Sequence, residues 1–172
     1  MCERGCRDTG AVNSVLYVDF GRRIVSCADD KTLRVFESVG PTQIKCVTDP
    51  DMHSLVCLRP HPSQPTFLAQ SMDNQILVYG CKGGKLKLET SKYTYKGHVV
   101  AGYGIEASFS ADGRFVSSGD AEGKMWVWDL KTLGIVKKFQ AHSKALITHT
   151  WYPGHASTLV TGGWDGAIRV WQ

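Results

Sequence analysis

The 172-residue chain has no apolar run approaching the ~18 residues that a membrane-spanning helix needs, so no such helix is predicted. Its first five residues, MCERG, carry charge with no apolar stretch behind them, and we expect no secretion signal. Helical hydrophobic periodicity of useful length is missing throughout. The net charge of +4 is too small to indicate nucleic-acid binding by itself.

Cysteine is absent after residue 81, and the six cysteines up to that point do not form a metal-ligand set. Cys2 and Cys6 make one C-x3-C pair, whereas a structural zinc site needs four convergent ligands. We therefore expect no metal. Without a secretion signal a disulfide framework is not expected either, and several thiols are predicted to pack as small apolar residues.

The chain does contain a repeated seven-residue pattern. Each copy begins with an acidic residue, has apolar residues three and five positions later and ends in an aromatic residue: 30–36 (DKTLRVF), 73–79 (DNQILVY), 122–128 (EGKMWVW) and 165–171 (DGAIRVW). The terminal aromatic residues are 43, 49 and 43 positions apart. Agreement in both composition and spacing indicates four structural units.

Each unit has the local pattern of β-structure. Ile105, Ala107 and Phe109 alternate with polar residues, which places one face of a strand toward a core. The Asp112–Gly113 pair then supplies the positive-φ residues of a tight hairpin. The sequence predicts three or four antiparallel strands per unit, too few for one unit to bury both faces of its sheet.

A period near 43 residues, with a histidine (His98 or His142) about 30 residues before the terminal tryptophan, resembles the WD40 repeat, whose units are blades of a β-propeller. The resemblance implies an all-β fold of about four four-stranded antiparallel blades. Residues 1–10 are expected to form an N-terminal segment, followed by approximate units 11–40, 41–90, 91–134 and 135–172. Propellers of the family have seven blades and need roughly 300 residues, so we expect a fragment. The alternative is that residues 1–10 close a smaller ring.

In WD40 proteins a histidine, a hydroxyl, an acid and a tryptophan hydrogen-bond together and lock the strands of a blade. The resemblance implies two complete networks: His98, Ser118, Glu122 and Trp128 in the third unit, and His142, Thr161, Asp165 and Trp171 in the fourth. The first unit retains Ser26 and Asp30 without the histidine. The second has Ala69 in place of the hydroxyl and retains Asp73.

A histidine, a hydroxyl and an acid also suggest a catalytic triad. Their recurrence at the spacing of the repeat favours the structural role, however. The glycine-rich stretches 80–85 and 119–124 do not have the spacing and hydroxyl of a phosphate-binding loop, and no hydrolase motif is present. We expect no enzyme activity and no cofactor.

Several segments differ from a generic blade, namely 52–54 (MHS), 70–77 (QSMDNQIL), 96–103 (KGHVVAGY), 118–120 (SGD) and 163–166 (GWDG). Together they resemble a family of spliceosomal WD40 proteins, from about Val12 to Trp171. This resemblance implies a nuclear, non-enzymatic scaffold that supports the second catalytic step of pre-mRNA splicing. Its expected partners are spliceosomal proteins, with pre-mRNA or snRNA nearby, and neither a membrane nor a small-molecule substrate. The alternative is a generic WD40 adaptor that recognises a peptide motif, such as a ubiquitin-ligase substrate receptor.

The residue before each repeated acid is predicted to lie in the loop between the second and third strands, on the face that the family uses for partners. These residues are Asp29, Met72, Ala121 and Trp164. Trp164 is the strongest candidate because exposed aromatic residues are enriched at interfaces. Its alternative is a ring folded over its own blade. Tyr103 and Lys144 follow the two histidines and are expected to flank the same face, with Met72 also facing partners.

Two lysine-rich segments are predicted to form outer strands and their connections. They supply five candidate RNA-proximal groups: Lys82, Lys85, Lys87, Lys137 and Lys138. The alternative is a solvated sheet edge whose lysines oppose pairing with other strands. The alternation of aromatic and basic residues typical of single-strand readers is missing.

Overall fold

The computed structural model describes residues 9–40, 42–48, 51–82, 85–88, 94–154 and 157–172. Four antiparallel sheets follow one another along the described chain, which contains no helix, so the predicted all-β class is confirmed. Among these residues no helix has the length and apolar character to cross a membrane. The predicted N-terminal segment, with Cys2 and Cys6, lies outside the described residues up to position 8.

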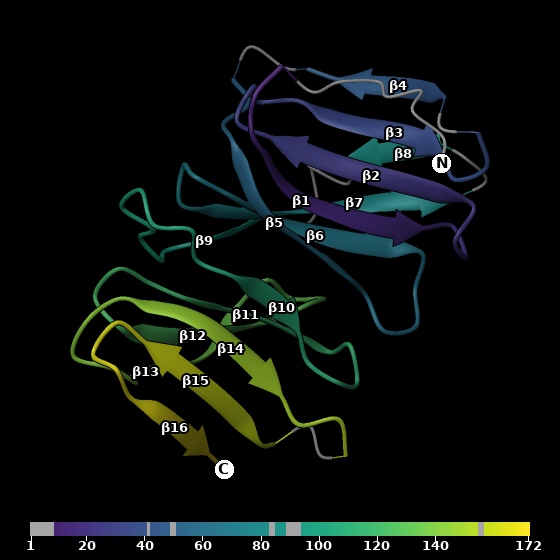
Figure 1. Cartoon of the computed structure of the whole chain (residues 1–172). Helices are drawn as coiled ribbons and strands as arrows, with labels where there is room; N and C mark the ends of the chain where they lie inside the picture. Colours follow the sequence, from purple (N-terminus) through teal and green to yellow (C-terminus); the bar gives the residue numbers. More distant parts are fainter. Residues whose placement is uncertain (1–8, 41, 49–50, 83–84, 89–93, 155–156) are drawn as a thin grey trace.

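The first two sheets occupy the upper half of Figure 1. In spatial order the first comprises β1 (Val12–Val18), β2 (Arg23–Ala28), β3 (Leu33–Glu37) and β4 (Gln43–Val47). The second comprises β5 (Leu55–Pro60), β6 (Thr66–Ser71), β7 (Gln75–Lys82) and β8 (Lys85–Leu88), with β9 (Thr94–Lys96) also paired to β7.

The other two sheets form the lower half of Figure 1. The third comprises β10 (Ala107–Phe109), β11 (Phe115–Gly119), β12 (Lys124–Asp129) and β13 (Ile135–Gln140). The fourth comprises β14 (Leu146–Trp151), β15 (Leu159–Gly163) and β16 (Ile168–Trp171). The predicted units and the sheets are offset by one strand, because β4 and β13 pair with the sheet that precedes them in the chain.

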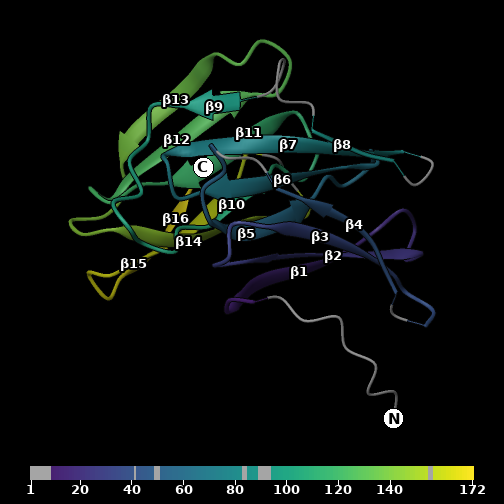
Figure 2. The same cartoon turned by 90° about the horizontal axis from the view of Figure 1, so that it is seen from above.

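The apolar core is divided into three clusters, one at each interface between successive sheets. The first includes Leu33 and Val35 of β3 packed with Leu58 of β5. Viewed from above, the second sheet lies between the first and the third (Figure 2). Burial of one such aliphatic side chain contributes about 1.5–3 kcal/mol, so stacking of the sheets is the main source of stability.

The predicted hairpin is present between β10 and β11, but of the two residues expected to have a positive φ, Asp112 and Gly113, only Gly113 has one. Gly113 has a φ of +71°, and the Ser110 hydroxyl donates to Asp112 Oδ1 at 2.6 Å. Asp112 in turn accepts the backbone N–H of Arg114 at 3.1 Å, which fixes the turn. The predicted packing of thiols is also confirmed for Cys27 and Cys57, which are both buried.

Two equivalent turn glycines offer a test of how closely the sheets approach. Gly123 and Gly166 follow the repeated acids and have φ values of +82° and +76°. A Cβ on Gly123 would collide with the carbonyl oxygens of His142 and Lys144, whereas a Cβ on Gly166 meets no atom within 4 Å.

We predict that Gly166→Ala lowers the free energy of unfolding by about 1 kcal/mol, the cost of a left-handed alanine. Gly123→Ala should cost about 1–3 kcal/mol more because the neighbouring backbone must also move. Urea unfolding of both variants measures the difference. Equal losses would show that the third and fourth sheets do not approach this closely.

Candidate functional site

The turns that follow β2, β6, β11 and β15 are held by one repeated backbone contact. In each, the residue before the acid position donates its N–H to a carbonyl of the segment that leads into the first strand of the same sheet. The acceptor directly precedes that strand in the first, second and fourth sheets and lies eight residues before it in the third. The four pairs are Asp29 to Ala11 (2.9 Å), Met72 to Ser54 (3.0 Å), Ala121 to Val99 (2.7 Å) and Trp164 to Ala145 (2.9 Å). These turns and the segments leading into the sheets form one surface, here called the loop face.

The most prominent feature of the loop face is an aromatic pair. The rings of Tyr103 and Trp164 meet edge to face, with centroids 4.9 Å apart and planes at 76°. Trp164 nevertheless remains 60 % exposed. The pair bridges the segment leading into the third sheet and the β15–β16 turn, so two candidates separated by 61 positions in the sequence meet in space. Lys144 is exposed close to this turn, and Met72 is half-buried in its own.

In the fourth sheet the four side chains of the implied network are joined by hydrogen bonds. His142 Nδ1 lies 2.8 Å from Asp165 Oδ1, and its Nε2 lies 2.8 Å from the Thr161 hydroxyl. The Trp171 indole N–H donates to the same hydroxyl at 3.0 Å. Burial tends to raise the pKa of the Asp165 carboxyl. Hydrogen bonds from His142 and from the backbone N–H groups of Ser143 and Ala167 outweigh burial and hold this pKa well below its usual range.

In the third sheet, two of the four residues that were expected to form the hydrogen-bonded network, Glu122 and Trp128, do not take part in it. Glu122 is exposed and pairs with the Lys124 ammonium instead of His98. Asp120, two residues earlier, is buried and takes the place of the acid. Its Oδ1 accepts the N–H groups of Glu122 (3.0 Å) and Lys124 (2.7 Å). Its Oδ2 accepts the Trp126 indole N–H at 2.7 Å.

The second expected member that fails is Trp128, whose indole nitrogen has no hydrogen-bond partner among the described residues. Its ring instead packs against the edge of His98, with centroids 5.3 Å apart. His98 Nε2 and the Ser118 hydroxyl both meet the side-chain amide of Gln70, at 3.0 and 3.3 Å. The second sheet thus supplies a polar group that the sequence pattern did not indicate.

In the first sheet Asp30 joins its own turn to Thr9, whose backbone N–H and hydroxyl donate to Asp30 Oδ2 at 3.2 and 2.9 Å. It accepts the N–H of Thr32 at 3.0 Å and a guanidinium N–H of Arg34 at 2.9 Å, while Ser26 is buried nearby in β2. Asp73 of the second sheet pairs with the Gln75 side-chain amide. Both acids therefore lie in the predicted turns without a histidine partner.

A buried polar cluster that sequence analysis missed joins the third and fourth sheets. His149 Nε2 lies 2.8 Å from the hydroxyls of both Ser108 and Ser117, and the Trp151 indole N–H donates to Ser117 at 2.8 Å. Burial is the main reason why the pKa of His149 falls to about 4, with a smaller contribution from Arg59. A lone histidine in a strand carries no sequence signal for such a cluster, because its partners come from another sheet.

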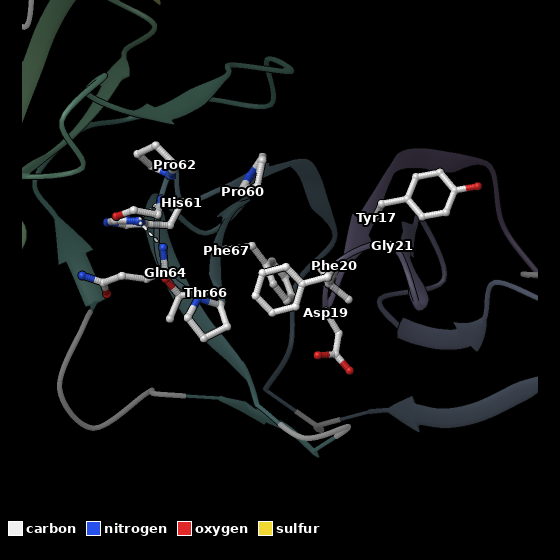
Figure 3. A pocket seen from close by; sticks show the side chains of 13 residues that line it. Tyr17, Asp19, Phe20, Gly21, Pro60, His61, Pro62, Gln64, Thr66 and Phe67 are labelled. Carbon is white, nitrogen blue, oxygen red and sulfur yellow. Dashed lines mark hydrogen bonds between the residues drawn. The ribbon is translucent and has the colours of Figure 1, made fainter.

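A cavity of about 260 Å³ lies at the opposite end of the strands from the loop face. The β1–β2 turn and the 61–65 loop line it, with His61 and Gln64 on one side and Tyr17 on the other (Figure 3). Phe20 is 97 % exposed there and has a φ of +56°, unusual for an aromatic residue. The feature of the sequence that could have indicated this cavity is Phe20, an aromatic residue in a tight turn.

The candidate RNA-proximal lysines divide into two sets. Lys137 and Lys138 are exposed on β13, and the Lys138 ammonium lies 3.7 Å from the centroid of the Trp126 ring. This contact is a cation–π interaction. The side chains of Lys82, Lys85 and Lys87 are outside the described part of the structure. RNA contact by these lysines stays a prediction.

Comparison with known families agrees with this architecture. The profile of the WD domain, G-beta repeat, matches residues 3–37, 89–129 and 134–172. The chain belongs to the WD40-repeat family, and its sheets are propeller blades. A solved structure, that of the computationally designed Ika4 protein, has the same fold with a TM-score of 0.74 at 21 % identity, covering 96 % of this chain and 92 % of that one.

Among characterised relatives, the chain is similar to Pre-mRNA-processing factor 17. It is 43 % identical to the human protein over 166 residues, which are 96 % of this chain and 28 % of that protein. It is 36 % identical to the Saccharomyces cerevisiae protein over 161 residues, which are 93 % of this chain and 35 % of that protein. The chain thus spans about a third or less of the length of these relatives.

We predict that Asp165→Ala destabilises the fold whereas Trp164→Ala does not, although the residues are adjacent. Removal of the carboxylate leaves donors on His142 and two backbone groups unpaired, and the melting temperature should fall by about 2–8 °C. The exposed Trp164 ring should change it by less than about 2 °C. Thermal melts of both variants decide this, and the opposite order would mean that the turn is placed one residue out of register.

We also predict that acid weakens the fold before its carboxylates titrate. The pKa values of His98 and His149 are both lowered from 6.5 to about 4, chiefly because burial disfavours the charged ring. Between pH 7 and 5.5 the unfolded chain therefore binds protons that the folded chain does not. The free energy of unfolding should fall by about 1 kcal/mol per histidine.

Urea unfolding at pH 7 and 5.5 measures this fall in stability. In His149→Gln the fall should shrink by about 1 kcal/mol, because the unfolded variant no longer takes up the proton that residue 149 binds in the wild-type chain. If the fall in stability is unchanged in both His149→Gln and His98→Gln, these two histidines are not the cause of the pH dependence.

Proposed function

We propose that the chain is a non-enzymatic WD40 scaffold of the spliceosome, which acts in the nucleus and supports the second catalytic step of pre-mRNA splicing. The observation that carries the proposal is the 43 % identity to human Pre-mRNA-processing factor 17 across 96 % of the chain. The partners are spliceosomal proteins bound through the loop face, with pre-mRNA or snRNA close by.

The loop face supports a binding role. Its turns are fixed by the repeated backbone contact, so side chains projecting from them are held in place without further ordering on binding. The Tyr103–Trp164 pair provides a large, partly exposed aromatic surface of the kind that anchors protein interfaces.

The histidine networks support a structural role and not a catalytic one. His142 has no exposed surface, and both its ring nitrogens are engaged by Thr161 and Asp165. A general base must reach the proton it abstracts, which this ring cannot do without breaking the blade. The set therefore stabilises the fourth sheet.

We predict that the tagged wild-type chain enriches snRNAs and splicing proteins from nuclear extract and that Trp164→Ala reduces this enrichment. Loss of a central aromatic residue costs about 2 kcal/mol of binding, or roughly thirtyfold in affinity. Tyr152→Ala is the matched control, because Tyr152 is an exposed aromatic residue at the other end of the fourth sheet.

Quantitative mass spectrometry and snRNA amplification give the two readouts. Recovery of cullin-type partners in place of snRNAs would favour the peptide-adaptor function instead. Equal recovery by the wild-type chain and by Trp164→Ala would show that Trp164 on the loop face does not contribute to binding. The splicing role would then be decided by whether the wild-type chain recovers snRNAs.

A further inference from the structure

The 61–65 loop of the second sheet is closed by the side chain of its own first residue. His61 Nδ1 accepts the backbone N–H groups of Ser63 at 3.1 Å and of Gln64 at 3.0 Å (Figure 3). Because both partners are donors, Nδ1 carries no proton, and the hydrogen of the neutral ring is on Nε2. Nε2 lies 3.1 Å from the carbonyl oxygen of Gly113 and donates to it. The hydrogen bonds thus require a neutral ring in one particular tautomer.

The His61 ring also joins two sheets. It follows β5 of the second sheet, whereas Gly113 belongs to the hairpin between β10 and β11 of the third. His61 is 7 % exposed, and its ring meets the Phe109 ring edge to face with centroids 4.7 Å apart. A Cβ on Gly113 would collide with the imidazole carbon Cε1, so the hairpin backbone lies directly against the ring. The second and third sheets each have a neighbouring sheet on both sides, and this contact lies between them.

The turn between β12 and β13 has the same arrangement with a different acceptor. Asp129 Oδ1 accepts the N–H of Lys131 at 2.9 Å and that of Thr132 at 2.8 Å, which are the same sequence offsets as in the 61–65 loop. A carboxylate accepts these bonds while it is charged, and the bonds from Thr132 and Lys131 lower the pKa of Asp129. The β12–β13 turn therefore stays closed throughout the pH range in which histidine titrates.

An imidazole differs from a carboxylate because it ceases to be an acceptor when it is protonated. A hydrogen on Nδ1 would face two N–H donors, so the imidazolium form of His61 is incompatible with the closed loop. Burial lowers the pKa of His61 from 6.5, and the hydrogen bond to Gly113 opposes this only in part. In an open, solvated loop the ring keeps the ordinary value. The closed loop is accordingly favoured above pH 6.5 and loses stability as the pH falls below it.

The end of β5 and three turns bring charged groups to the surroundings of His61. They are Arg59, Asp19, Asp112, Arg114, Asp129 and Lys131. Burial tends to raise the pKa of Asp112, but hydrogen bonds from the Ser110 hydroxyl and the Arg114 backbone outweigh it and lower this pKa. Asp112 and Asp129 thus both stay charged between pH 7 and 5. The charge that the third sheet presents to the ring does not change while histidine titrates.

We propose that His61 is a pH-sensitive latch, which holds the 61–65 loop against the third-sheet hairpin while the ring is neutral and releases the loop when Nδ1 takes up a proton. The loop is a wall of the 260 Å³ cavity and of a second cavity of about 310 Å³, which it shares with the hairpin and the β12–β13 turn. Release therefore changes both cavities, at the end of the strands opposite the loop face. The inference is independent of the proposed splicing role.

Backbone amide hydrogen exchange of the 172-residue chain, followed by NMR, tests the latch. The protection factor is the slowing of exchange relative to an unstructured chain at the same pH. We expect the protection factors of Ser63 and Gln64 to fall roughly fivefold to twentyfold between pH 7 and pH 5, because the closed loop excludes the protonated ring. Those of Lys131 and Thr132 should change far less, because their acceptor stays charged. An equal change in both turns would overturn the proposal, since it would reflect a general loss of stability.

His61→Asn is the matched variant, because the amide oxygen stands near the place of Nδ1, accepts N–H groups and does not titrate. Its protection factors at residues 63 and 64 should be the same at both pH values, and a fall that persists in this variant would overturn the proposal. The ¹⁵N shifts of the wild-type ring give a second measurement that needs no variant. At pH 7 Nδ1 should be the unprotonated nitrogen, and its protonation should accompany the loss of protection. A protonated Nδ1 at pH 7 would also overturn the proposal.

Discussion

Each sheet of this protein has an apolar face that a neighbouring sheet covers, and this requirement shapes the rest of the structure. A four-stranded sheet cannot fold onto itself, so its apolar third strand is buried only when the next sheet packs upon it. Val35, Val78 and Val127 are buried in this way at three successive interfaces. The core is consequently a series of layers between sheets, and the closeness of the layers makes a turn such as the one at Gly123 intolerant of a side chain.

The stacked sheets turn a repeat in sequence into a surface in space. Because each sheet runs in the same direction relative to its neighbours, equivalent turns gather at one end, each held by a backbone hydrogen bond to the segment that leads into its sheet. One residue of such a turn points inward and the next outward. In the fourth sheet Asp165 is bound by His142, while Trp164 contacts Tyr103 and remains exposed. Stability and recognition are thus assigned to neighbouring residues.

The polar networks differ among the sheets although the apolar pattern does not. The fourth sheet joins His142, Thr161, Asp165 and Trp171, whereas the third replaces the acid with Asp120 and uses Gln70 of the second sheet. The longer side chain of Glu122 can extend to solvent and pair with Lys124, which leaves the turn to the shorter carboxylate. Apolar burial between the sheets is therefore the common requirement, and the polar groups are satisfied in whatever way each interface allows.

The sequence by itself determined the strands, the hairpin at Asp112–Gly113 and the apolar residues of each third strand, because these depend on alternation and turn chemistry within a few residues. It also placed Trp164 and Asp165 in one turn. Only the tertiary structure decided which acid is buried, which amide meets His98 and that Tyr103 reaches Trp164. The contacts of Gln70 with His98 and of Tyr103 with Trp164 join different sheets, and no local pattern encodes the distance between side chains that are brought together by packing. The one-strand offset between repeat and sheet arises within single sheets, because β4 and β13 pair with β3 and β12, the strands that directly precede them in the chain.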